Sequence, residues 1–453
     1  MFDFSASYYQ HKIDAKPQIA VPAESFRIVN DIPTFKNELK ALINQAQCRI
    51  YITALYLQDD ESGREILDCI YRRSEENPQL EVFILVDFHR AQRGLMGKGK
   101  QCGNHVMYRE YALNHPRANV KILGIPVKSK EVFGVLHLKG FVIDDYVLYS
   151  GASINNVYLA WDTRYRLDRY QIISNQELAD SLVQYIKDFF LTSPAVTDLC
   201  QDKIPAVKSI YDNISCLKKN LKHSCYKFNP SLSLSKSEVG IVPLVGLGNI
   251  KNQLNHTIIE LIDACEKKIT ICTPYFNMPR PVSKNIARLL KRGCHVTIVV
   301  GDKIANDFYI PEDQKFNRVG AVPYMYQGIL RDFCQKFQNY IDNGQLDIML
   351  WKDGTNTYHV KGMFVDDNYY LLTGNNINPR AWRMDIENGL LVKDPHKLLR
   401  ESFAGELNNI LTNTKRISNW QEIEDFCQYP ERIQNYLRKI YRFKLHLLIK
   451  RII

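Results

Sequence analysis

The sequence predicts an α/β fold in which two duplicated sandwich domains, related by pseudo-twofold symmetry, share one site at their interface. Three observations predict it: β-prone runs alternate with helical segments, distant halves repeat one order of elements, and two segments are near copies. These copies are "HLKGFVIDDYVLYSGASINN", from His137, and "HVKGMFVDDNYYLLTGNNIN", from His359. Such alternation is typical of layered α/β architectures with helices against a largely parallel sheet.

The internal repeat sets the expected domain boundaries. "LINQAQCRIYITALYLQ", from Leu42, aligns with "LIDACEKKITICTPYFN", from Leu261, and "LEVFILVD", from Leu80, aligns with "CHVTIVVGD", from Cys294. Each half therefore repeats strand, helix, strand and then a hairpin. We expect an N-terminal domain over residues 1–195, a linker or insertion over 196–245, a C-terminal domain over 246–410 and a basic helical segment over 411–453.

Composition limits the partners and the compartment. The net charge of +10 favours an anionic partner, such as nucleic acid, a phosphorylated substrate or an acidic membrane. Eleven cysteines without a CxxC pair, and an N-terminus without a signal sequence, indicate a reducing, cytosolic compartment. No apolar run approaches the roughly 18 to 20 residues that cross a bilayer, so we expect any membrane contact to be peripheral.

Two basic segments allow two interpretations each. "CLKKNLKHSCYKFNPSLSLSKSE", from Cys216, is either a solvated connection or a surface that contacts a membrane. "ERIQNYLRKIYRFKLHLLIKRII", from Glu431, has seven Lys or Arg residues and one acid, with apolar residues near helical spacing at Ile433, Leu437, Ile440 and Leu447. It is either an amphipathic helix at a headgroup surface or a helix packed on the core with a solvated basic face.

The repeated histidine and lysine are expected on one face of a strand. His137 and Lys139 are two residues apart in an apolar, β-prone run, and His359 and Lys361 repeat that spacing. Side chains two apart leave a strand on the same side. If the two halves pair about a pseudo-twofold axis, all four side chains meet in one cleft.

An aspartate follows each lysine at a predicted hairpin turn. Asp144 and Asp366 each lie five residues after the lysine and precede a second β-prone run. The second copy is one residue longer, and we place the extra residue in the turn, at Asn368, because turns tolerate insertion best.

Two imidazoles, two ammonium groups and several Asn amides in one cleft favour a phosphate. Lysine donates to phosphoryl oxygens, and Asn adds neutral hydrogen bonds. A neutral histidine can attack phosphorus while a protonated one gives its proton to the leaving oxygen. A carboxylate on the far ring nitrogen would orient each imidazole. The candidates for this carboxylate are Asp144, Asp366, Glu387 and Asp168.

These residues resemble the HxKx4D motif of the phospholipase D superfamily, present twice as in its two-copy members. "DFHRAQRG", "GVLHLKGFVIDDYVLYSGASINNVYL", "WKDGTNTYHVKGMFVDD" and "LTGNNINPRAWRMDIENGLL" together resemble its bacterial phosphatidylserine synthases, over most of the chain. The resemblance implies two phospholipase D-like α/β/α sandwich domains. It also implies transfer of a phosphatidyl group from CDP-diacylglycerol to L-serine, with release of CMP, at the cytoplasmic face of the cell membrane.

The resemblance also implies roles for individual residues. The catalytic set is His137, Lys139, Asp144, His359, Lys361 and Asp366. The expected substrate-binding set is Asn155, Asn376, Asn378, Glu387, Arg90, Arg93 and Arg169. Family members commonly have Gly-Ser-x-Asn after the aspartate, whereas this chain has "GASINN" and "GNNIN". The phosphate contact therefore stays open between Ser153, Asn155 and Asn156 in one copy, and between Asn376 and Asn378 in the other.

The expected mechanism is a double displacement. His137 attacks phosphorus, as is usual in the superfamily, and His359 protonates CMP and then deprotonates serine; the near symmetry of the copies allows the reverse assignment. We expect no metal and no cofactor, because the lysines neutralise the phosphate. Arginines could clamp the serine carboxylate or the nucleotide diphosphate, or could be surface residues. These arginines are Arg90, Arg93, Arg166 and Arg169.

Three other functions compete with this hypothesis. A phosphodiesterase, lipase or nuclease, would use the same residues with water as acceptor, and a cardiolipin-type synthase would transfer the group to another acceptor. A basic binding module would have damaged motifs, and both motifs are complete here. The expected partners are CDP-diacylglycerol, L-serine and an anionic membrane surface, without nucleic acid, and the oligomeric state is not readable.

Overall fold

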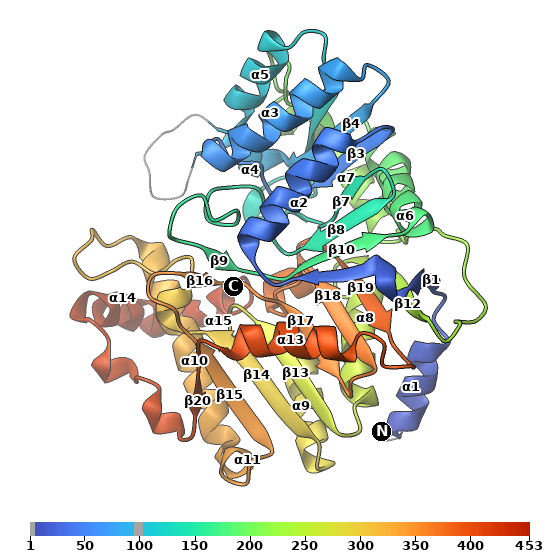
Figure 1. The fold of residues 1–453 in the computed structure, drawn as a ribbon. Helices are drawn as coiled ribbons and strands as arrows, with labels where there is room; N and C mark the ends of the chain where they lie inside the picture. Colours follow the sequence, from blue (N-terminus) through green and yellow to red (C-terminus); the bar gives the residue numbers. More distant parts are fainter. Residues whose placement is uncertain (1–4, 95–102) are drawn as a thin grey trace.

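The computed structural model describes residues 5–94 and 103–453, which form two α/β halves stacked on one another (Figure 1). The first half has an eight-stranded sheet in the order β11 (Thr197–Asp198), β5 (Val120–Ile125), β4 (Glu81–Asp87), β3 (Arg49–Thr53), β7 (Phe141–Ile143), β8 (Tyr146–Ser150), β10 (Tyr170–Ser174) and β2 (Phe26–Val29). The second half has a ten-stranded sheet in the order β1 (Ile19–Pro22), β12 (Glu238–Leu247), β19 (Ile386–Lys393), β18 (Tyr369–Thr373), β17 (Gly362–Val365), β13 (Lys268–Thr273), β14 (His295–Gly301), β15 (Leu346–Trp351) and β20 (Thr414–Ile417), with β6 (Leu136–His137) beside β19.

Helices cover both faces of each sheet, as the predicted sandwich requires. The first sheet carries α2 (Ile32–Gln45), α3 (Glu61–Glu76) and α5 (His105–Asn114) on one face, and α6 (Gln176–Ile186) and α7 (Tyr211–Leu221) on the other. The second carries α1 (Ala6–Asp14), α8 (Gln253–Ala264), α9 (Arg280–Lys291) and α10 (Val322–Lys336) on one face, and α13 (Arg400–Leu411) on the other. A central apolar cluster takes residues from both halves, among them Tyr149, Leu217, Ile241 and Phe403.

The sheets are mixed, so the prediction of a largely parallel sheet is wrong. The parallel runs are β3, β4 and β5, and their counterparts β13, β14 and β15, and β6 pairs parallel with β19 over two residues, whereas the other described pairs of these two sheets are antiparallel. The motif strands return through turns too short for a parallel crossover, and such turns force antiparallel pairing. Ile143 pairs with Tyr146 across a two-residue turn, whereas Val365 pairs with Tyr369 across three residues, so the extra residue does lie in the second turn.

The chain ends and the linker differ from the predicted domain boundaries. β1 pairs with β12, and α1 packs on α8, so the first residues of the described chain belong to the second half. β12 begins at Glu238, inside the predicted linker, and its continuous apolar run pairs with β1 on one side and β19 on the other. The repeat alone does not give these boundaries: β12 is the counterpart of β2, which pairs with β10 as β12 pairs with β19, but β1 precedes β2 in the chain and joins the second sheet.

Two buried carboxyl oxygens connect the exit of β4 to the first motif. Asp87 Oδ1 accepts hydrogen bonds from the backbone N–H groups of His89 (3.0 Å) and Arg90 (2.9 Å), at the start of α4 (Phe88–Gln92). Its Oδ2 accepts a hydrogen bond from the N–H of Leu136 in β6, at 2.9 Å. One side chain thus positions both Arg90 and the strand that carries His137.

The C-terminal helix α14 (Glu431–Arg442) packs on the core. Ile433, Leu437 and Ile440 are buried against residues at the start of α10, which confirms the packed-helix interpretation for α14. The side chain of Leu447 lies outside the described part of the chain. Nowhere in residues 5–94 and 103–453 is a helix both long enough and apolar enough to cross a bilayer.

Candidate functional site

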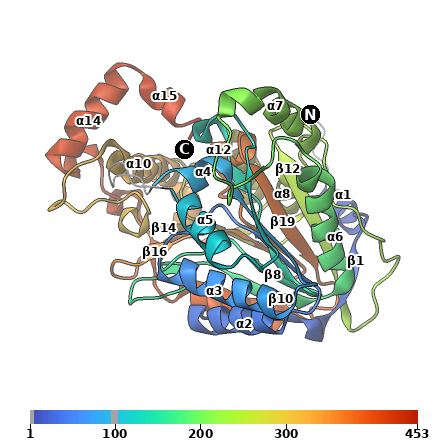
Figure 2. The same cartoon turned by 90° about the horizontal axis from the view of Figure 1, so that it is seen from above.

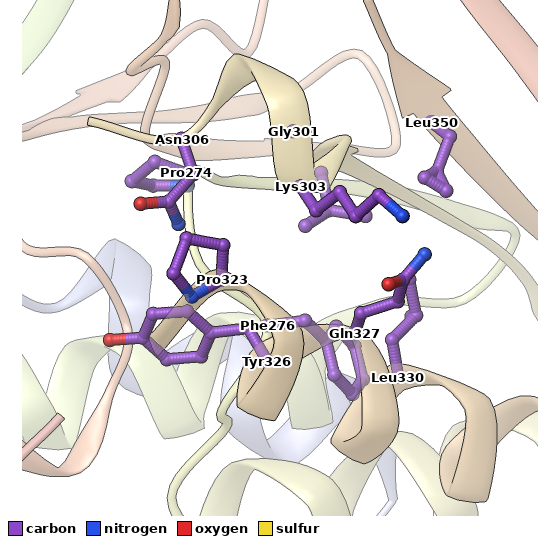
Figure 3. A pocket seen from close by; sticks show the side chains of 11 residues that line it. Pro274, Phe276, Gly301, Lys303, Asn306, Pro323, Tyr326, Gln327, Leu330 and Leu350 are labelled. Carbon is purple, nitrogen blue, oxygen red and sulfur yellow. The ribbon is translucent and has the colours of Figure 1, made fainter. Parts of the chain in front are cut away.

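A cleft of about 1240 Å³ between the two halves collects most of the predicted site residues. The predicted residues that line it are His137, Lys139, Asn155, His359, Asn376, Asn378, Arg90 and Arg93. A second cavity of about 20 Å³, between the exit of β14 and α10, has room for about one water molecule (Figure 3). Tyr326 lines both, but only the larger cleft can hold a substrate.

His137 is oriented by a carboxylate from the second half. Its Nδ1 lies 2.9 Å from Glu387 Oε1 and 2.8 Å from Oε2, because β6 pairs with β19 and sets the two residues opposite one another. A carboxylate at Nδ1 requires a proton there, which leaves the lone pair on Nε2. Burial, and then the charges of Lys139 and Lys361, lower the pKa of His137 well below its usual value, so the imidazole is neutral.

His359 is oriented by residues from the first half. Its Nδ1 lies 2.9 Å from the Tyr158 hydroxyl and 3.5 Å from Asp168 Oδ2. Lys361 also contacts Nδ1, and its Nζ donates to Asp168 Oδ2 at 3.0 Å. Burial, and then Lys361, lower the pKa of His359 to about 4, while Asp168 and Asp307 act in the opposite direction.

The two halves exchange their orienting groups symmetrically. The short parallel pair β9 (Arg166–Leu167) and β16 (Thr357–Tyr358) ends next to Asp168 and His359, just as β19 and β6 present Glu387 and His137. Of the four candidate carboxylates, Asp168 and Glu387 therefore contact the histidines.

Glycines make room for this exchange. A Cβ at Gly151 would lie 2.8 Å from Lys361 Nζ, and one at Gly374 would lie 2.9 Å from Lys139 Cγ. Each glycine follows the second strand of one motif and meets the lysine of the other. Larger side chains at these two positions would push the lysines out of place.

Asp144 and Asp366, the other two candidates, lie away from the histidines and bind backbone instead. Asp144 accepts hydrogen bonds from the N–H groups of Gln47, Cys48 and Arg49, at 2.8, 2.8 and 3.0 Å. Asp366 repeats the arrangement at the start of β13, with three N–H groups between 2.6 and 2.9 Å. Both carboxylates anchor the turn of a motif hairpin to the strand beside it, which is a structural role.

The predicted arginines divide between cleft and core. Arg90 lines the cleft with its guanidinium over the Tyr56 ring, 4.8 Å from the centroid, and Arg93 lines it while paired with Glu131 at 2.6 Å. Arg169 does not line it: its guanidinium is buried against Glu406, at 2.6 Å. The expectation that Arg169 binds substrate is therefore corrected, because a side chain with these buried partners cannot reach the cleft.

The asparagines use part of their hydrogen-bonding capacity within the protein. Asn378 Oδ1 caps α12 (Pro379–Arg383) by accepting from Ala381 N–H at 2.9 Å, and Asn155 donates from Nδ2 to the Tyr56 hydroxyl at 3.3 Å. Asn376 Oδ1 is buried and has no hydrogen-bond partner among the described residues. All three side chains can still turn an amide toward a phosphate oxygen in the cleft.

Several residues that line the cleft are absent from the predicted site residues, although Tyr158 and Arg380 lie within the segments that resemble the family. Tyr158, Tyr275, Asp307 and Arg380 line the cleft, and Asp307 Oδ2 lies 3.9 Å from His359 Nε2. Only their place in the folded chain identifies them. Within the described residues, no group of three or more His, Cys, Asp or Glu side chains is arranged to hold a metal ion.

Known proteins match this chain along most of its length. A family model described as "Cardiolipin synthase, PLD-like domain" matches residues 39–189 and 258–412. The CDP-diacylglycerol–serine O-phosphatidyltransferase of Haemophilus influenzae is 47% identical to this chain, over 98% of each of the two chains. That of Escherichia coli is 39% identical to this chain, over 99% of each. A crystal structure of the phosphatidylserine synthase of Haemophilus influenzae superimposes with a TM-score of 0.96 at 46% identity, over 99% of this chain and 100% of that one. The chain therefore belongs to the phospholipase D-like proteins with two repeated domains, and within them to the bacterial phosphatidylserine synthase family.

Proposed function

We propose that this protein transfers the phosphatidyl group of CDP-diacylglycerol to the hydroxyl group of L-serine and releases CMP, through a phosphatidyl-histidine intermediate. One observation carries the proposal: two histidines from duplicated motifs face one cleft, each oriented at Nδ1 by groups of the opposite half. Relatives that are 47% and 39% identical along nearly the whole chain bear this activity in their names.

His137 is the nucleophile of the first step. Its Nε2 lone pair attacks the phosphatidyl phosphorus, and the bond from phosphorus to the CMP oxygen breaks. His359 Nε2 gives its proton to that oxygen. Asp168 and Asp307 flank His359 on opposite sides of the ring, and both favour its protonated form, as does the negative charge of a bound substrate.

Serine reverses these events in the second step. His359 Nε2 takes the hydroxyl proton, the serine oxygen bonds to phosphorus, and the bond from phosphorus to His137 Nε2 breaks, returning its electron pair to the ring. Lys139 and the cleft asparagines hold the non-bridging oxygens during both steps. Lys139 has no carboxylate partner among the described residues, whereas Lys361 is paired with Asp168, so Lys139 has the freer positive charge.

Trapping the intermediate tests the assignment. With labelled CDP-diacylglycerol and no serine, His359→Ala should retain a covalent phosphatidyl adduct that His137→Ala lacks, because only the nucleophile forms the bond. The wild type should release CMP faster when serine is added and should form phosphatidylserine. An adduct in His137→Ala alone would reverse the two roles, and CMP release unaffected by serine would contradict the transfer reaction.

The substrate's lipid nature requires contact with a bilayer, and we infer a peripheral association with the inner face of the cell membrane. Helices α7, α14 and α15 (Leu445–Ile449) lie along one side of the molecule (Figure 2). Phe443, just before α15, is 68% exposed, and Leu448, within α15, is 56% exposed, while Ile452 and Ile453 line the cleft. Exposed apolar groups among basic residues at the entrance of a cleft suit an anionic lipid surface.

A further inference from the structure

A carboxylate lies beside the reactive nitrogen of His359, where it favours the protonated imidazole but also places a negative charge next to the phosphate of the donor. Asp307 Oδ2 is 3.9 Å from His359 Nε2, and both side chains line the cleft. The other carboxylates that contact the histidines, Asp168 and Glu387, lie on the Nδ1 side of each ring. A carboxylate on the Nε2 side repels the phosphate oxygens of the donor unless a cation lies nearby.

Asp307 forms a fixed pair with an arginine. The Tyr275 hydroxyl donates to Asp307 Oδ2 at 3.0 Å, and Arg166 Nη2 lies 2.7 Å from Oδ1. Arg166 in turn donates from Nε to Thr357 Oγ1 at 3.1 Å, and its guanidinium lies over the Tyr158 ring, 4.7 Å from the centroid. Burial acts to raise the pKa of Asp307, but Arg166, His359, the Tyr275 hydroxyl and Lys361 together outweigh burial and hold that pKa below its usual value. The cleft therefore presents one negative and one positive charge side by side.

The two halves differ at this point of the repeat. Asp87 and Asp302 occupy equivalent places at the exits of β4 and β14, where each caps the following turn. The segment after Asp87 supplies Arg90 to the cleft, whereas the segment after Asp302 supplies Asp307. The acid beside the catalytic histidine thus belongs to the His359 side and is not a general feature of the repeated domain.

Only one side of the phosphorus receives the acceptor. In the proposed double displacement, His137 occupies one apical position, so CMP departs and serine arrives on the opposite side, next to His359. The serine hydroxyl must then reach His359 Nε2, and its ammonium and carboxylate groups, on the neighbouring carbon atom, lie close to the same residues. A zwitterion at this place needs one acidic and one basic partner.

We propose that Asp307 and Arg166 form the subsite that selects the acceptor, with Asp307 binding the α-ammonium group of the amino acid and Arg166 binding its α-carboxylate group. This inference rests on the proposed transfer to serine and goes further, because it assigns acceptor specificity to two named residues. Arginine suits a carboxylate through paired donors, and among the described residues none accepts a hydrogen bond from its Nη1.

Acceptors that lack one charge test the assignment. Ethanolamine has the hydroxyl and the ammonium group, and 3-hydroxypropanoate has the hydroxyl and the carboxylate group. We expect Asp307→Asn to raise KM about tenfold or more for L-serine and ethanolamine, but not for 3-hydroxypropanoate. Arg166→Gln should raise KM by a similar factor for L-serine and 3-hydroxypropanoate, but not for ethanolamine.

Two nearby residues provide matched controls. Asp162 and Arg164 also line the cleft but are exposed, so Asp162→Asn and Arg164→Gln change the same charges near the entrance. Neither should alter the preference among the three acceptors. Arg166→Lys keeps the charge without the paired donors, so its KM for L-serine should lie between those of the wild type and Arg166→Gln. Circular dichroism and gel filtration check that each variant folds.

The outcome distinguishes this inference from the proposed function. If Asp307→Asn affects all three acceptors equally, Asp307 acts on His359 and not on the ammonium group, and the subsite assignment is wrong. The subsite assignment is also wrong if Asp307→Asn and Arg166→Gln change KM for the same acceptors. If wild-type protein makes no phosphatidylserine from CDP-diacylglycerol and serine, the transfer reaction itself fails, whatever the variants do.

Discussion

Individual side chains make the two copies of the motif chemically different. Lys361 is paired with Asp168 at 3.0 Å, whereas the hydrogen bonds from Lys139 Nζ within the described residues go to the Ala152 carbonyl and the Ser153 hydroxyl, at 3.3 and 3.4 Å. Its charge is buried and uncompensated, and a phosphate oxygen is the partner that would restore the balance. We therefore infer that the duplication supplies one lysine to the structure of the site and one to the substrate.

Lys139 should give the reaction an alkaline limit near neutrality. Burial, and then Lys361, lower the pKa of Lys139 to about 7, so its ammonium group is charged below that pH and neutral above it. As pH rises through about 7, kcat/KM for CDP-diacylglycerol should fall, approaching about tenfold for each further unit, because this ratio reports the free enzyme. In Lys139→Arg, the pH at which kcat/KM begins to fall should be higher, and a pH profile of kcat/KM measures this shift. An unchanged limit in that variant would assign it to another group.

Glu387 should act through His137 and not on substrate. Glu387→Gln keeps the size of the side chain but can donate to Nδ1, which favours the wrong tautomer and takes the lone pair from Nε2. We expect kcat to fall about 10² to 10⁴-fold, with KM for serine changed little. Steady-state kinetics measure this split. A loss confined to KM for either substrate would show that Glu387 binds that substrate.

At the level of elements, the aspartate of each motif fastens a hairpin to the strand beside it. Asp144 has φ 48° and Asp366 has φ 53°, a left-handed conformation that aspartate tolerates better than most residues. Each carboxylate satisfies three N–H groups at the start of β3 or β13. The carboxylate thus holds the hairpin turn against the start of the neighbouring strand. This contact fixes the position of the hairpin strand that follows the motif histidine and lysine.

Asp144→Ala should weaken folding and not catalysis. Removing the acceptor of three backbone hydrogen bonds should lower the free energy of unfolding by about 1–3 kcal/mol. Urea denaturation measures the loss, and the activity of the folded fraction should stay near that of the wild type. Asp145→Ala, which removes only an exposed ion pair with Arg49, is the matched control and should cost at most about 1 kcal/mol. A catalytic role would reverse this pattern, with normal stability and lost activity.

At the scale of the whole molecule, the two halves are held together by contacts that no repeat predicts. Arg169, from the first half, is paired with Glu406 of α13, and Gln171 donates to the same carboxylate at 2.7 Å. The N-terminal strand β1 joins the second sheet, and β2 joins the first. These crossings keep both motifs on one cleft.

The sequence predicts the parts of the site better than their assembly. Two copies of a local motif identify His137 and His359, and the extra turn residue at Asn368 follows from spacing alone. The sequence does not show which two of the four candidate carboxylates orient the histidines, because Glu387 and Asp168 reach them only when the two halves pack together. Asp307 belongs to no motif.

Membrane contact should depend on both charge and the exposed apolar groups. Vesicles with anionic lipid should sediment the protein, and vesicles of neutral lipid should not. The Lys218→Gln/Lys222→Gln double variant removes two positive charges, one from α7 and one from the residue that follows it, at about 1 kcal/mol each, and should weaken binding about thirtyfold at low salt. Added salt should also weaken the binding of the wild type to anionic vesicles, because it screens the attraction between the charges.

Phe443→Ser tests the apolar part of the same surface. Because Phe443 is 68% exposed, this variant should bind anionic vesicles more weakly, yet fold as stably as the wild type. Lys236→Gln, on an exposed loop before β12, is a control for loss of charge elsewhere and should bind normally. Sedimentation that ignores anionic lipid, salt and all of these substitutions would place the lipid-binding surface on another face, and with it the route by which CDP-diacylglycerol reaches His137.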